Sequence, residues 1–215
     1  LRRWARFNSP LRGPVLAVHE YLLYQTLLGT MPVAPSDPEA PDAYADRIVR
    51  YMHKAAREGK TGTSWTRPDA AYEEALERFV RGVLAPRPDN AFLADLGRVV
   101  GTLDRFGALN GVSLTLLKYS SPGVPDLYQG CELIDRSLVD PDNRRPVDYG
   151  ERERLLEAMQ ALAAAASGSA LAQAVSGFAA TPSDGRAKLW LTWRLLAVRQ
   201  RWPALFRHGS YEPLE

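Results

Sequence analysis

Cysteine, long apolar runs and an excess of either charge are all scarce in this sequence of 215 residues. Its single cysteine, Cys131, excludes an intrachain disulfide and a thiolate metal cluster, and it fits a reducing compartment. No apolar run approaches the roughly 18 residues that a membrane-spanning helix needs. The 27 Lys and Arg residues nearly balance 25 Asp and Glu residues, which gives no reason to expect a nucleic-acid or anionic-membrane partner. We therefore expect a cytoplasmic protein with no membrane or nucleic-acid partner.

The first residues, LRRWARFNSP, include neither an initiator Met nor the apolar segment of a signal peptide. We expect the chain to begin inside a longer polypeptide. The arginines of this stretch indicate a solvated terminus rather than a binding arm.

Sequence patterns for metal and phosphate sites are also missing. The three histidines are far apart and share no ligand spacing. The stretch 140–148 has the oxygens of a calcium loop but carries Arg144 and Arg145 at its fifth and sixth positions, where a ligand and a glycine are required. The Gly59-Lys60-Thr61 triplet lacks the preceding glycine of a phosphate-binding loop. We therefore expect no metal site.

Helical periodicity dominates what remains. It predicts helices over 20–28, 43–58, 70–84, 91–102, 109–119, 151–166 and 186–201. Asp42 and Asp69 are the expected N-caps of the helices at 43–58 and 70–84, and Gly59 is expected to end the first of these. Gly107 is expected to interrupt the helical structure between 91–102 and 109–119. The fold class is therefore mainly α.

The connecting segments add one or two short strands at most. A proline-rich loop is expected over 31–42, a polar loop over 132–149 and a flexible connection over 167–185. Residues 124–128 predict a short strand. Because a lone strand cannot satisfy its own backbone groups, this segment is either irregular or lacks its partner strands.

Two polar segments contain the candidate binding residues. Trp65 lies between Ser64 and Thr66, where packing and ligand contact are equally reasonable, whereas the tryptophans at 190, 193 and 202 are expected in the core. Residues 140–148 combine Asp, Asn and Arg side chains. From the residues alone, a rigid loop tied by Arg–Asp pairs is favoured, and recognition of sugar hydroxyls or an anion is the alternative.

Several segments together resemble one family. They are EYLLYQTLLG (20–29), AYADRIVRYMHKAAREGKTGTSW (43–65), LLKYSSPGVPDLYQGCEL (116–133), SLVDPDNRRPVDY (137–149) and KLWLTWRLLAVRQRWPALF (188–206). In this order they resemble maltooligosyl trehalose synthase, a branch of the α-amylase superfamily. The sequence departs from the family pattern at 60–68, at 110–115 and at Cys131, where Thr is usual.

The resemblance implies a glucan isomerase that needs no cofactor. Such an enzyme converts the reducing-end α-1,4 bond of a maltooligosaccharide into an α,α-1,1 bond by intramolecular transglycosylation with retention, using paired carboxyl groups. The family's catalytic carboxylates would precede residue 1. We therefore expect no catalytic residue here and no isomerase activity from the isolated chain, and the partner is a maltooligosaccharide in the full-length enzyme.

The implied architecture is a C-terminal fragment of a (β/α)₈ barrel with a helical insertion. Residues 1–30 would hold the helix after barrel strand seven, 31–108 the insertion, and 109–166 a helix, strand eight (124–128), its loop and a helix. Residues 167–215 would be a linker and a helix that leads to a missing β domain. An exposed barrel edge at strand eight would favour self-association.

The resemblance also implies which residues face the substrate. After strand eight they are Tyr128, Gln129, Asp142, Asn143, Arg144 and Arg145, and Lys60, Ser64 and Trp65 would form a wall or cover. Their expected role is to bind and orient glucose units. The alternative is a stand-alone helical module that binds carbohydrate or protein without catalysis, and such a module would expose no strand edge.

Overall fold

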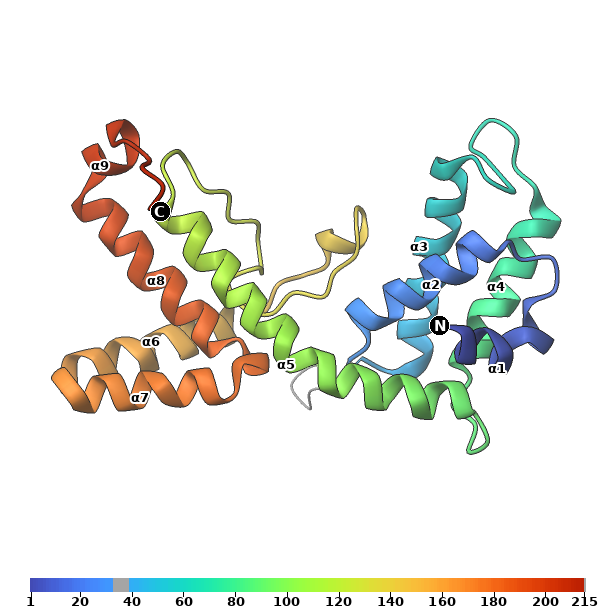
Figure 1. Ribbon diagram of the computed structural model, residues 1–215, viewed down its shortest axis with the longest axis horizontal. Coiled ribbons are helices and arrows are strands. Elements are labelled where there is room, and N and C mark those ends of the chain that lie inside the picture. Colours follow the sequence, from blue (N-terminus) through green and yellow to red (C-terminus); the bar gives the residue numbers. More distant parts are fainter. Residues whose placement is uncertain (33–38, 215) are drawn as a thin grey trace. The chain divides into compact units, whose positions relative to one another are not determined.

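The computed structural model describes residues 1–32 and 39–214 (Figure 1). Its α-helices are α1 (Arg2–Arg12), α2 (Ala17–Thr30), α3 (Pro41–Gly59), α4 (Ala70–Leu84), α5 (Ala91–Ser120), α6 (Tyr149–Ala165), α7 (Gly168–Ala180), α8 (Arg186–Arg201) and α9 (Pro203–His208). Two short 3₁₀ helices are η1 (Asp142–Arg144) and η2 (Pro182–Asp184). None of the described helices is long and apolar enough to cross a membrane.

The chain forms two compact units. The first comprises residues 1–103 and 136–145, and the second comprises 104–135 and 146–215. The helix α5 therefore contributes its first part to one unit and its second part to the other. The expected mainly-α class is confirmed.

The first unit is organised around α3 and α4, which pack against each other, with α2 on α3 and α1 on α4. Its core residues without exposed surface are Leu23, Leu27, Ile48, Met52, Ala56, Leu76, Phe79, Val80, Val83 and Leu96. An aromatic cluster closes one end, where Trp4 makes edge-on contacts with Tyr24 and Phe92. Trp4 also donates a hydrogen bond of 2.6 Å from Nε1 to Asp95 Oδ2.

Helix ends in this unit follow local chemistry. The Asp69 carboxylate accepts a hydrogen bond from the Tyr72 amide at 3.0 Å, so the predicted N-cap of α4 is confirmed. The prediction for Asp42 was wrong, because α3 begins at Pro41, whose fixed φ suits a first helical turn. Gly59 is the last residue of α3, and Lys60 then adopts a left-handed φ of 53°.

The second unit is organised around α8, against which α6, α7 and α9 pack. On α8, Trp190 contacts Trp193 and also Phe178 of α7, with ring centroids 5.3 and 6.0 Å apart. The expectation of core tryptophans was wrong: Trp190 and Trp193 are only half-buried, and Trp202 is 54% exposed, with the Arg201 guanidinium 5.4 Å from its ring centroid.

The chain is more helical than the sequence predicted in three places. α5 runs unbroken through Gly107, because one glycine costs a helix only about 1 kcal/mol. Residues 168–180 form α7 instead of a flexible connection, since the segment is rich in alanine, the best helix former. The N-terminal stretch, expected to be solvated, forms α1 and buries Trp4 and Asn8 one turn apart.

The predicted strand at 124–128 is not formed, and residues 1–32 and 39–214 contain no strand. The segment finds no partner backbone over its length. Just before it, the Gly123 amide donates to the Phe206 carbonyl at 3.0 Å. Half of the proline-rich loop predicted at 31–42, residues 33–38, lies outside the described residues, and its last two residues belong to α3.

Candidate functional site

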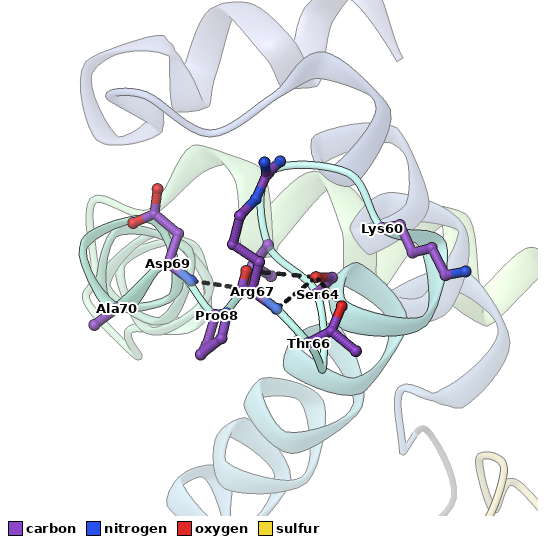
Figure 2. A pocket seen from close by; sticks show the side chains of 9 residues that line it. Lys60, Ser64, Thr66, Arg67, Pro68, Asp69 and Ala70 are labelled. Atoms are coloured by element: carbon purple, nitrogen blue, oxygen red, sulfur yellow. Dashed lines mark hydrogen bonds between the residues drawn. The ribbon is translucent and has the colours of Figure 1, made fainter.

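The loop between α3 and α4 forms a hydrogen-bonded, hollowed surface in the first unit (Figure 2). A tight turn closes it, in which the Ser64 amide donates to the Arg67 carbonyl at 3.2 Å and the Arg67 amide donates to Ser64 Oγ at 3.0 Å. The hollow has a volume of about 800 Å³. Figure 2 shows Lys60 at one end and Asp69 and Ala70 at the other. Lys60 and Ser64, both predicted site residues, therefore line one hollow.

The same turn presents Trp65 at its tip. The indole is 59% exposed, and the Arg57 guanidinium lies 4.8 Å from its ring centroid. This distance allows a cation–π interaction. Because the turn is closed by its own hydrogen bonds, the exposure of Trp65 follows from an ordered backbone.

Glu73 on α4 supports both Trp65 and the loop. Its carboxylate accepts hydrogen bonds from Arg57 Nε at 2.8 Å and Nη2 at 2.6 Å, and from Thr63 Oγ1 at 2.7 Å. Thr63 Oγ1 in turn accepts from the Asp69 amide at 3.0 Å. The Arg57 guanidinium is the largest cause that lowers the pKa of Glu73, to about 2. The carboxylate is therefore charged at neutral pH and holds α3, α4 and the loop together.

The segment 136–145 is tied to α3 through Arg47, whose side chain is only 4% exposed. Arg47 donates two hydrogen bonds to Glu39, from Nε at 3.0 Å and from Nη2 at 2.6 Å. Its Nη1 donates to Asp142 Oδ2 and to the Arg136 carbonyl, each at 3.3 Å. Burial lowers the pKa of Arg47, but hydrogen bonding and attraction from Glu39 more than offset this, so the net pKa is raised.

Asp142, Arg144 and Arg145 form the Arg–Asp pairs of the favoured interpretation. Asp142 Oδ2 accepts from the Leu138 amide at 2.6 Å, and its Oδ1 lies 3.3 Å from Arg145 Nε. Arg144 pairs with Asp140. These contacts confirm a loop tied by its own charged side chains. Whether the loop also binds sugar hydroxyls or an anion is not tested by these contacts.

A cavity of about 430 Å³ lies between α3, the 136–145 segment and Trp65. Its lining residues are Arg47, Arg50, Tyr51, His53, Lys54, Arg57, Trp65, Val139, Asp140, Pro141, Asp142 and Arg145. It brings together three of the predicted site residues, namely Trp65, Asp142 and Arg145. In the described part of the chain, no group of three or more His, Cys, Asp or Glu side chains could hold a metal ion.

The other predicted residues are placed elsewhere. Asn143 and Arg144 belong to the same segment but do not line the cavity, and Lys60 and Ser64 line the separate hollow. Tyr128 and Gln129 belong to the second unit, where both side chains are exposed. The structure thus does not gather the nine predicted residues around one cavity.

Sequence reasoning missed the cationic face of α3. Arg47, Arg50, Lys54 and Arg57 follow one another at intervals of three, four and three residues, which places them on one side of a helix. That spacing was visible in the sequence. Glu73, the partner of Arg57, could not be recognised from this spacing, because it belongs to another helix, α4.

Known proteins resemble this chain over most of its length. No protein-family model matches it. It is 40% identical to a candidate maltooligosyl trehalose synthase of Mycobacterium tuberculosis (strain CDC 1551 / Oshkosh) over 160 residues. The chain is related to one part of the maltooligosyl trehalose synthases. The match covers 73% of this chain and 20% of that protein, so the chain spans about a fifth of the length of its relatives. A protein of strain H37Rv matches equally.

Solved maltooligosyl trehalose synthases share the fold. One crystal structure superposes on the whole chain with a TM-score of 0.78 and 28% sequence identity, and 26% of that protein is covered. The maltooligosyltrehalose synthase of Arthrobacter ramosus is 33% identical, with a TM-score of 0.67. Here the match covers 95% of this chain and 24% of the other. Sequence and structure therefore indicate the same family.

Proposed function

We propose that this chain is part of a glucan isomerase that turns the reducing-end α-1,4 bond of a maltooligosaccharide into an α,α-1,1 bond. The observation that carries the proposal is the 40% identity to a candidate maltooligosyl trehalose synthase over 160 residues. The reaction would be an intramolecular transglycosylation by paired carboxyl groups. Those carboxylates would come from regions of the parent protein outside this chain.

The role proposed for this chain is to bind and orient glucose units. An exposed indole on a hydrogen-bonded turn offers a flat apolar face, which suits the face of a pyranose ring. In the first unit, Lys60 and Ser64 would contact hydroxyls from their own hollow, and Asn143 and Arg144 would add polar contacts. In the second unit, Tyr128 and Gln129 would make polar contacts of their own. Asp142 and Arg145 would act mainly by holding their segment against α3, as their ion pairs indicate.

We also propose that the chain corresponds to the C-terminal part of a (β/α)₈ barrel with a helical insertion, in a cytoplasmic parent protein. The second unit exposes several large apolar side chains. Val124 is 99% exposed, and Phe106, Leu114 and Leu117 are also largely exposed. Apolar surface of this kind favours a part of a larger protein over the stand-alone helical module. It also favours self-association of the isolated chain, which sedimentation at several concentrations would test.

Maltopentaose binding to the purified chain tests the substrate role. Titration calorimetry should show saturable binding that Trp65→Ala weakens at least about tenfold, because ring burial against an indole is lost. Trp202→Ala is the matched control, since that indole is equally exposed and also lies beside an arginine. Equal effects of the two variants would contradict the role of Trp65.

A product assay tests the division of labour. The isolated chain incubated with maltopentaose should form no trehalose-type, non-reducing product, because the catalytic carboxylates are proposed to lie outside it. If the purified chain forms such a product, and this activity is lost only when the chain is denatured, this part of the proposal is overturned.

A further inference from the structure

The cavity beside α3 has an uneven charge inventory. Five cationic side chains line it, Arg47, Arg50, Lys54 and Arg57 from α3 and Arg145 from the facing segment. Only two carboxylates line it, and Glu39 and Glu73, which pair with Arg47 and Arg57, lie outside the lining. Cations concentrated in a concave surface raise the local concentration of anions.

The two lining carboxylates are already occupied. Asp142 receives Arg47 Nη1 and the Leu138 amide on Oδ2 and lies beside Arg145 Nε through Oδ1. Asp140 pairs with Arg144, which lies outside the lining. Each of the two lining carboxylates therefore already faces a cation, Asp142 through Arg47 and Arg145 and Asp140 through Arg144.

Several donors remain unused. Among the described residues, the Arg50 side chain has neither an ion pair nor a hydrogen bond, and it is exposed at the cavity. The ammonium group of Lys54 donates to the Asp140 carbonyl and lies 3.8 Å from Glu58, which leaves it further N–H donors. The cavity thus presents many hydrogen-bond donors and few acceptors. An anion whose oxygens accept hydrogen bonds would fit such a wall.

We propose that this cavity binds a phosphate group, either as free phosphate or as the phosphate of a small sugar. A phosphate offers only acceptor oxygens to the wall and forms its strongest hydrogen bonds with guanidinium and ammonium donors. A cavity of about 430 Å³ is of the size that small molecules occupy. Trp65 and Tyr51 in the lining offer aromatic faces for an attached sugar ring. This inference does not depend on the glucan isomerase reaction.

The experiment titrates inorganic phosphate, glucose 6-phosphate and glucose separately into the purified chain by calorimetry at low ionic strength. Both phosphates should bind saturably, and added sodium chloride should weaken binding. Arg50→Gln should lower the affinity at least about tenfold, as expected for a lost charge-assisted contact. Because Arg50 has no partner among the described residues, this change should leave the fold unaltered, which circular dichroism can verify.

Arg6→Gln on α1 is the matched control, because it removes an equal charge from an exposed position outside the cavity lining. It should leave phosphate affinity unchanged. Tighter binding of glucose 6-phosphate than of inorganic phosphate would identify a sugar phosphate as the ligand, and equal binding would identify the phosphate group alone; both support the site. The proposal is overturned if neither phosphate binds saturably, if both variants weaken binding equally, or if neutral glucose binds as tightly with the same dependence on Arg50.

Discussion

Arg57 and Glu73 form a two-point ion pair between α3 and α4, with Nε 2.8 Å from Oε1 and Nη2 2.6 Å from Oε2. The same guanidinium lies beneath the exposed ring of Trp65, and the same carboxylate accepts a hydrogen bond from Thr63. One buried carboxylate therefore orients two parts of the loop that joins the helices. Loss of its charge should loosen the loop as well as the helix pair.

Replacement of this carboxylate by an amide gives the first prediction. Glu73→Gln should lower the free energy of unfolding by about 2 kcal/mol at neutral pH, because charge-assisted hydrogen bonds are lost. The pKa of Glu73 is lowered to about 2 in the folded chain, below its ordinary value. The contribution of the charge is therefore fully present above about pH 5 and declines as the pH falls toward 2. Urea unfolding between pH 2.5 and 7 measures this difference.

Glu77→Gln on α4 is the control for that experiment. Glu77 pairs with Arg81 one helical turn away on the surface, at 2.7 Å, and such pairs contribute little. Its stability difference from the parent chain should be small at every pH. A difference for Glu73→Gln that does not shrink in acid would show that the Arg57 pair is not what stabilises the loop.

Much of the fold could be predicted from local sequence signals. The bounds of α4 and α8 agree with the predicted helices, because Asp69 caps the first and Trp202-Pro203 ends the second. α7 was missed because small residues were interpreted as flexible, although Phe178 packs against Trp190 of α8. The strand at 124–128 was wrong, since strand formation depends on a partner backbone that no local pattern reveals.

The candidate site could be predicted only in part, because it is assembled by contacts between distant segments. The tied loop was predicted from its alternating Asp and Arg residues, and Arg144–Asp140 and Arg145–Asp142 confirm the pairs. Its attachment to α3 depends on Arg47, 95 residues from Asp142. Nothing local marks Arg47, among the several charged residues of α3, as the partner of a remote carboxylate.

Gly62 gives the second prediction. Its φ of +77° lies in the left-handed region, and an added Cβ would lie 2.7 Å from Cε1 and Cζ of the Tyr72 ring. Gly62→Ala should therefore destabilise the first unit by more than about 1 kcal/mol. Gly97→Ala is the control, because Gly97 lies inside α5 with no atom near its Cβ position and should gain about 0.5–1 kcal/mol. Thermal unfolding of both variants measures the contrast, and similar shifts would contradict the clash.

The buried Arg47 gives the third prediction. Arg47→Met should cost about 3 kcal/mol, because Glu39 and Asp142 would remain partly buried without their shared cation. Adding Glu39→Gln to this variant should restore part of the loss, since one uncompensated charge is removed. Urea unfolding measures both, and proteolysis should cut the 136–145 segment faster in the single variant. Strictly additive losses would show that Arg47 and Glu39 do not act as a pair.

The fourth prediction concerns Arg199 of α8, which donates hydrogen bonds to carbonyls at the end of α5 within the second unit. Its Nη1 donates to the carbonyls of Tyr119 and Ser121, each at 2.9 Å, and its Nη2 donates to the Gly123 carbonyl. Its guanidinium also lies 4.3 Å from the ring centroid of Phe206. A single planar group therefore satisfies one carbonyl in the last turn of α5, that of Tyr119, and two carbonyls of the turn that follows the helix.

Arg199→Lys keeps the charge but removes this forked geometry, so it should destabilise the second unit by about 1–2 kcal/mol. The Gly123 amide, which donates to the Phe206 carbonyl, should exchange its hydrogen faster as the turn after α5 loosens. Arg201→Lys is the matched control, since among the described residues that guanidinium contacts the exposed ring of Trp202, 5.4 Å away, and makes no ion pair or side-chain hydrogen bond. Equal exchange at Gly123 in the two variants would show that the hydrogen bonds from Arg199 to these carbonyls do not hold the turn.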